Sequence, residues 1–183
     1  MLKRIWLALL LVLITACSSS VKSVKTEQNQ VLAPNEGYLL LSVNSNIQLD
    51  SMKIFGAKTL FITKEDLKAG ANYILLPVPA GDYRLAEVDQ PGMYYTSLNN
   101  EKGIWSFTIE AGKINYVGNF TYESYYVDNA SFTAFLENRG SEGFKYMQEK
   151  FPSLLKQHSM RFAGNGDDFF FQYIQELTAG AKP

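Results

Sequence analysis

The chain has 183 residues, of which 46% are hydrophobic and 14% aromatic, and it carries 17 basic and 18 acidic side chains for a net charge of −1. This length suits one domain with a substantial core. The charge balance argues against the basic surface that nucleic-acid binding needs, so no nucleic acid is expected as a partner. Cys17 is the only cysteine, which excludes an internal disulfide and zinc sites built on several thiolates.

The first residues have the layout of an export signal. Lys3 and Arg4 precede an apolar run over residues 5–14, and small residues follow. A helix needs about 20 apolar residues to span a bilayer, and this run is too short for that. We therefore predict that residues 1–16 are a signal peptide that is removed.

The residues Ile14-Thr15-Ala16-Cys17 resemble the lipobox of bacterial lipoproteins. The resemblance implies cleavage between Ala16 and Cys17, a diacylglyceryl thioether on Cys17, and a third acyl chain on its freed amine. Two or more acyl chains hold a protein firmly on a membrane. Ser18 stands where an aspartate would retain such a protein at the inner membrane of a Gram-negative cell. The implied location is the outer membrane, facing the periplasm, with no cofactor beyond the covalent lipid. An ordinary signal peptide beside a chance cysteine is the alternative.

Residues 17–36 are predicted to be the lipidated cysteine and a flexible tether. The segment is rich in serine, lysine and glutamine and has few large apolar groups with which to offset its chain entropy. For about 20 residues in a random coil, the expected reach is about 25 Å.

Residues 37–137 are predicted to form an antiparallel β-sandwich of about seven or eight strands, with a small barrel as the alternative. Short β-rich runs recur along the segment, separated by turn residues. They cover residues 38–43, 52–55, 59–62, 73–78, 83–88, 93–97, 104–109, 114–122 and 131–136. In the run 114–122, alternation places Ile114, Tyr116, Gly118, Phe120 and Tyr122 on one face, with the aromatic residues in the core.

Residues 138–183 are predicted to form a helical extension packed on the sandwich. Phe144, Met147 and Phe151 have the spacing of one helix face. Pro152 interrupts that helix and suits the first turn of a second one over 152–157. The aromatic segment 169–177 fits either a helix, with acids at its start, or a strand.

Two motifs carry a resemblance to a known fold. They are Pro79-Ala80-Gly81-Asp82-Tyr83-Arg84-Leu85 and Ile109-Glu110-Ala111-Gly112-Lys113-Ile114-Asn115-Tyr116-Val117-Gly118. Together they are similar to the transthyretin-like or carboxypeptidase-regulatory-like sandwich domains of bacterial envelope lipoproteins, over roughly residues 37–137. The resemblance implies a turn that delivers Tyr83 to the core and a hairpin that starts the next strand. It implies no catalytic residues.

The residues with chemical potential form no recognisable catalytic set. His158, the only histidine, is predicted to cap or follow a short helix. The pair Asp167-Asp168 lacks the spacing of a calcium loop and suits helix capping. Glu65-Asp66 with Glu87 or Glu110 offers a carboxylate pair of the kind glycosidases use, but the mundane interpretation is solvated strand ends.

The aromatic residues Tyr94, Tyr95, Tyr125 and Tyr126 form a possible exposed binding platform. The prediction is a membrane-anchored, non-enzymatic binding or scaffolding module of the cell envelope, whose partner is an envelope protein or a cell-wall polymer. One alternative is an envelope hydrolase that uses His158, Glu65 and Asp66 in an atypical site. The other is a carrier of a small apolar ligand.

Overall fold

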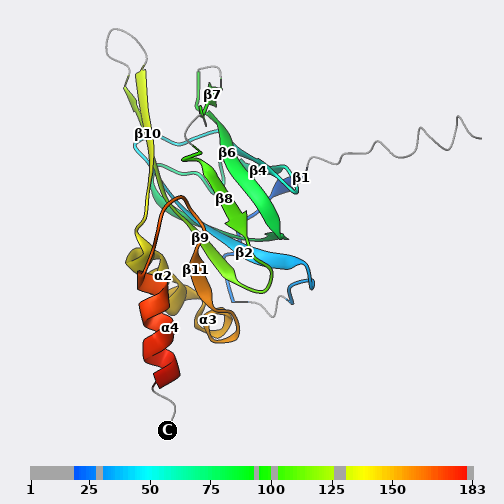
Figure 1. Ribbon diagram of the computed structural model, residues 1–183. Helices are drawn as coiled ribbons and strands as arrows, with labels where there is room; N and C mark the ends of the chain where they lie inside the picture. The colour runs from blue at the N-terminus through cyan, green and yellow to red at the C-terminus, as the bar shows by residue number, and fades with distance from the viewer. Residues whose placement is uncertain (1–18, 28–30, 93–94, 100–102, 126–130, 181–183) are drawn as a thin grey trace, which may run out of the picture.

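The computed structural model describes residues 19–27, 31–92, 95–99, 103–125 and 131–180. Two β-sheets pack face to face, and three helices gather beside one of them (Figure 1). Strands hold far more of the described residues than helices do, so the prediction of a mainly β sandwich with a short helical C-terminal part is confirmed.

The first sheet consists mostly of antiparallel neighbours. Its order is β1 (Ser19–Val21), β4 (Leu60–Thr63), β3 (Ser51–Gly56), β6 (Gly81–Asp89) and β7 (Thr96–Ser97), and β8 (Ser106–Ile109) also pairs with β6. The pairing of β1 with β4 is parallel. β1 was not predicted, because its three residues carry no recognisable alternation.

The second sheet has the order β10 (Ser131–Glu137), β9 (Ile114–Tyr125), β2 (Glu36–Ser45) and β5 (Gly70–Pro79). β2 and β9 are parallel neighbours, so the sandwich is mixed and not purely antiparallel. β11 (Met160–Phe162) pairs in parallel with the start of β9, although it lies in the C-terminal segment that was predicted to be helical. The helical extension therefore contributes to the sheet as well as covering it.

Three helices cover the outer face of the second sheet. They are α2 (Gly140–Lys150), α3 (Pro152–Gln157) and α4 (Phe170–Gly180), which confirms the helical break at Pro152. The ambiguous aromatic segment is thus a helix, and Asp168 caps it by accepting a hydrogen bond from the backbone N–H of Phe170 at 2.7 Å. Among the described helices, none is long and apolar enough to cross a membrane.

The fold has two apolar cores, one between the sheets and one between the second sheet and the helices. β2 contributes to both, since Leu39 and Leu41 face the other sheet while Tyr38 and Leu40 face the helices. This explains the unbroken apolar run in its sequence, which is typical of a strand that is buried on both faces.

The prediction that Ile114, Tyr116, Phe120 and Tyr122 share one face of β9 is wrong. All four are buried, but Ile114 and Tyr116 pack in the helix-side core, whereas Phe120 and Tyr122 pack between the sheets. The register against β2 shifts at this point, leaving Val117 as an extra residue. One inserted residue reverses the direction of every following side chain.

The prediction of a flexible tether is wrong for residues 19–27. β1 extends the first sheet, and the backbone N–H of Ser23 donates to Oδ2 of Asp66 at 2.8 Å. The N–H of Leu75 donates to Oγ of Ser23 at 3.0 Å, and that of Val24 to the carbonyl oxygen of Leu75 at 2.9 Å. The segment therefore joins the edges of both sheets, with backbone pairing supplying the stabilisation that its side chains lack.

Candidate binding surfaces

The clearest exposed apolar feature is a row of side chains on α4, which we name the α4 stripe and define as Phe169, Tyr173 and Leu177. Residues four apart lie on one face of a helix. Their exposed fractions are 71%, 59% and 52%. The backbone N–H of Tyr173 donates to the carbonyl oxygen of Phe169 at 2.9 Å, so Phe169 belongs to the first helical turn.

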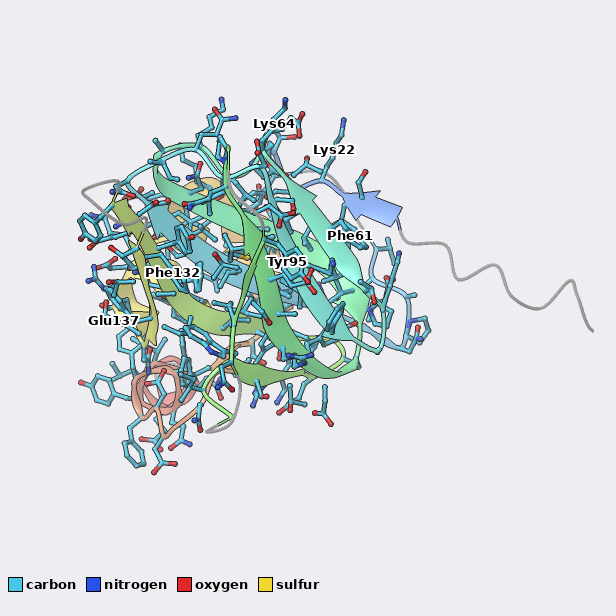
Figure 2. The ribbon with its side chains drawn as sticks, turned by 90° about the horizontal axis from the view of Figure 1, so that it is seen from above. Lys22, Phe61, Lys64, Tyr95, Phe132 and Glu137 are labelled. Carbon is cyan, nitrogen blue, oxygen red and sulfur yellow. The ribbon has the colours of Figure 1, made fainter. Side chains whose placement is uncertain are left out.

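The opposite face of α4 fixes the helix to the rest of the protein. Phe171 is buried and lies edge-on to Tyr116, with ring centres 6.3 Å apart, and Phe170 lies edge-on to Phe144 at 6.0 Å. Nε2 of Gln175 donates to the carbonyl oxygen of Met160 at 3.0 Å. The α4 stripe is consequently presented on a packed helix, and Figures 1 and 2 place that helix on the side of the molecule away from β1.

The sequence contains the signal for this stripe in the spacing of its aromatic residues. In a helix, the aromatic residues of this segment fall on two different faces, and only one of these faces can pack against the core. The surplus face is the α4 stripe.

The predicted tyrosine platform is described only in part. Tyr95 is 62% exposed and Tyr125 is 46% exposed, while Tyr94 and Tyr126 lie outside the described residues. Tyr95 precedes β7 in the first sheet and Tyr125 ends β9 in the second. Within the described part of the chain, no ring contact joins the two, so a shared platform remains a prediction.

A stacked aromatic pair with one exposed member does occur nearby, where β10 pairs with β9. The ring of Phe132, which is exposed, stacks on the buried ring of Tyr122 with centres 5.7 Å apart. Phe132 lies on β10, at the edge of the second sheet (Figure 2). Among the described strands β10 has a neighbour on one side only, so this edge combines apolar side chains with an open strand edge, a combination that favours contacts with another strand.

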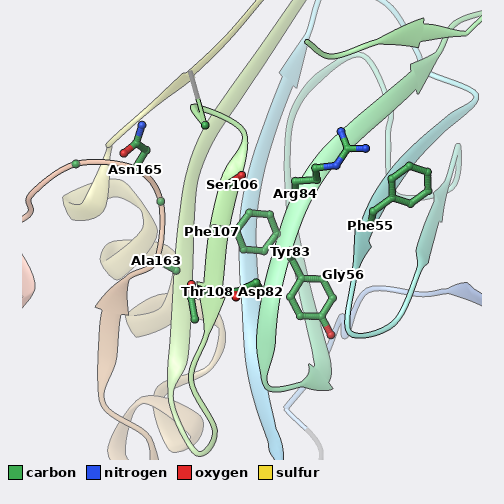
Figure 3. Close-up of a pocket in the computed structure, with 13 residues that line it drawn as sticks. Phe55, Gly56, Asp82, Tyr83, Arg84, Ser106, Phe107, Thr108, Ala163 and Asn165 are labelled. Carbon is green, nitrogen blue, oxygen red and sulfur yellow. Dashed lines mark hydrogen bonds between the residues drawn. The ribbon is translucent and has the colours of Figure 1, made fainter. Parts of the chain in front are cut away.

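A groove of about 610 Å³ lies between β3, β6, β8 and the loop 163–166 (Figure 3). Its charged groups already have partners. Thr108 Oγ1 donates to Oδ1 of Asp82 at 2.7 Å, and the guanidinium carbon of Arg84 lies 5.1 Å from the ring centre of Phe55. The groove has a mixed polar and aromatic lining, and no histidine, cysteine or lysine is among its described lining residues.

His158 lies where the helix-capping prediction places it. Its backbone N–H donates to Leu154 at the end of α3, and its Nδ1 lies 2.9 Å from the carbonyl oxygen of Gly112. The contact requires the tautomer with hydrogen on Nδ1, because a carbonyl only accepts. The ring also lies edge-on to Tyr38, at 5.4 Å between centres. These contacts hold the β8–β9 connection, which passes from the first sheet to the second, against α3.

The predicted carboxylate candidates have separate partners. Asp66 is buried and forms an ion pair with Lys25, Glu65 accepts a hydrogen bond from Thr63, and Glu87 pairs with Lys53. Glu110 contacts Lys113 and Arg161, and the hydrogen bond from Lys113 lowers the pKa of its carboxyl. Each carboxylate therefore has a structural contact, and among the described residues no group of three or more metal-ligating side chains is found.

The lipobox lies outside the described residues, so the structure begins two positions beyond Cys17. The resemblance to transthyretin-like domains likewise remains a prediction. Comparison of the chain with protein-family models, with curated proteins and with solved structures found no match.

Proposed function

We propose that this protein is a lipid-anchored envelope lipoprotein whose sandwich acts as a non-enzymatic binding module, with the α4 stripe as its contact surface for another protein. The single observation that carries the binding role is the stripe itself. Three large apolar side chains are more than half exposed on a helix whose other face is packed against the core. Contiguous apolar surface of this kind is typical of protein–protein contact sites.

The anchor rests on the lipobox pattern around Cys17 and on the signal-like segment before it. The lipid on Cys17 would hold the domain at the membrane. The proposed location is the outer membrane, with the protein facing the periplasm. The helix α4 lies on the side of the molecule away from β1, the first described strand after Cys17 (Figure 1).

Replacing Cys17 by serine is expected to leave a folded domain that no longer fractionates with membranes. Serine has no thiol to carry the diacylglyceryl thioether. A single acyl chain elsewhere would hold the protein on the membrane only weakly. Membrane fractionation, with circular dichroism of the recovered protein, measures both parts. A Cys17→Ser protein that stays in the membrane fraction would contradict the lipid anchor.

A photo-crosslinking residue at position 173 is expected to give a defined adduct in cells, and the same residue at Lys145 on α2 serves as the matched exposed control. Adding Phe169→Ser and Leu177→Ser to the position-173 chain should abolish the adduct, because it removes the remaining apolar contacts. The mass of the adduct separates a second copy of this chain from a different protein. The binding proposal fails if position 173 gives no adduct, or if Lys145 gives the same one.

The competing hydrolase is separated from the binding module by His158→Ala and Glu65→Gln. A hydrolase that uses either side chain would lose its cellular phenotype, whereas a binding module would retain it. Asp66 is unsuitable for this comparison because it holds Ser23 and Lys25 in place.

A further inference from the structure

The chain between the proposed lipid and the folded domain is too short to act as a spacer. Only Ser18 lies between Cys17 and Ser19, where β1 begins, so two residue steps separate them. An extended chain spans at most about 3.6 Å per residue, so this connection reaches about 7 Å. A lipid on Cys17 would accordingly hold the β1 edge of the first sheet next to the headgroups.

Several contacts fix β1 and the residues after it to the rest of the domain, so this segment does not act as a flexible tether. Ser19, Ser20 and Val21 pair with Leu60, Phe61 and Ile62 of β4. Beyond β1, Asp66 binds both the backbone of Ser23 and the side chain of Lys25, while Ser23 also accepts a hydrogen bond from β5. Asp66 is only 4% exposed, which strengthens its charged interactions relative to those in water.

The same edge is basic in a chain that is slightly acidic overall. Residues 19–25 and 53–68 contain six lysines and only two acids, Glu65 and Asp66. Asp66 is paired with Lys25, whereas Glu65 accepts a hydrogen bond from Thr63 and places its charge near Lys22 and Lys64, so the lysines remain in excess at this edge. Lys22, Lys58 and Lys64 are exposed, and Figure 2 shows Lys22 and Lys64 extending outward on the same side of the molecule, near β1.

We propose that the β1 edge, defined as β1, β4 and the exposed lysines Lys22, Lys58 and Lys64, lies directly on an anionic phospholipid leaflet. This inference rests on the proposed lipid anchor. Lysines near an anionic leaflet are attracted to it within about a Debye length, and the short connection keeps them within that range. The module is then seated edge-on, with the α4 stripe turned toward the aqueous side.

The test uses the full lipidated protein, in which the Cys17 thiol is occupied by the thioether and an added cysteine is the only reactive one. A fluorophore is placed on Lys58→Cys, Lys64→Cys or the matched control Lys145→Cys. Each protein is reconstituted in vesicles of phosphatidylethanolamine and phosphatidylglycerol that contain a headgroup-linked quencher. Quenching is expected to be several-fold stronger at positions 58 and 64 than at 145, and this difference should shrink in phosphatidylcholine vesicles.

Asp66→Asn is expected to release the N-terminal segment and bring the three positions toward equal quenching, whereas the neighbouring exposed change Glu65→Gln should not. Circular dichroism reports whether Asp66→Asn still folds. If it does not fold, the proposal is tested by the quenching at positions 58, 64 and 145 in the protein that retains Asp66. Equal quenching at all three positions of membrane-bound protein would overturn the edge-on seat while leaving the lipid anchor intact. Protein recovered without membrane would overturn both.

Discussion

Asn115→Leu is expected to lower the free energy of unfolding by about 3 kcal/mol, because it removes a buried amide that satisfies several backbone groups at once. The Asn115 side chain is fully buried. Its Nδ2 donates to the carbonyl oxygens of Tyr38, Glu110 and Lys113 at 3.2, 3.0 and 3.1 Å. Its Oδ1 accepts from the backbone N–H of Glu110 at 3.0 Å. Leucine has a similar volume and none of these bonds.

Urea unfolding followed by tryptophan fluorescence measures this change, because Trp105 is buried and is the only tryptophan in the described residues. Asn44→Leu is the matched control, since Asn44 is an exposed asparagine in β2. We expect the control to change stability by less than about 0.5 kcal/mol, as surface substitutions usually do. Equal losses in the two variants would contradict the role assigned to Asn115.

Gly37→Ala is the second large effect, with an expected loss of about 3 kcal/mol or failure to fold. A Cβ at position 37 would overlap the carbonyl oxygen of Glu110 and lie 2.9 Å from Nδ2 of Asn115. Both neighbours are held in place, because the Asn115 amide is hydrogen-bonded to the backbone N–H and the carbonyl oxygen of Glu110. The backbone must therefore shift to admit one methyl group.

Gly70→Ala separates crowding from backbone strain. Gly70 has a φ of +89°, but no atom lies within 4 Å of an added Cβ. Its expected cost, about 1 kcal/mol, comes from the left-handed backbone alone. If Gly70→Ala destabilised the protein as much as Gly37→Ala in the same urea experiment, close packing would not be the reason for glycine at position 37.

The sandwich was predictable because most of its strands are bounded by glycine, proline and asparagine turns. The turn at Gly81 leads directly to Tyr83, which is buried and whose hydroxyl donates to the carbonyl oxygen of Pro79 at 2.9 Å. Burial of this phenol raises its pKa. Local turn chemistry and alternation are enough to recover such elements.

β1 and β11 were not predictable in the same way. Each has three residues and joins its sheet through a parallel partner distant in sequence, β4 or β9. A polar segment such as 19–27 looks disordered by composition, yet Asp66 and β5 supply partners for its backbone. Long-range backbone pairing leaves no local pattern in either partner.

The candidate site was predicted less well than the fold. The tyrosines at 95 and 125 were identified from their surroundings and are exposed, but the α4 stripe was overlooked because its segment fitted a strand as well as a helix. Strand alternation would have placed Phe169, Tyr173 and Leu177 with Phe171 on one buried face. The helical period of 3.6 residues, by contrast, puts Phe169, Tyr173 and Leu177 on a different face from Phe171.

The extra residue at Val117 makes the length of β9, and not only its composition, critical to the protein. Deleting this residue would turn Phe120 and Tyr122 toward the helices and expose the space between the sheets that they fill. A substitution at the same place alters one side chain, whereas a deletion exchanges the inward and outward sets along the rest of the strand. Related chains with this architecture should therefore tolerate changes of residue type here far better than a gap in alignment.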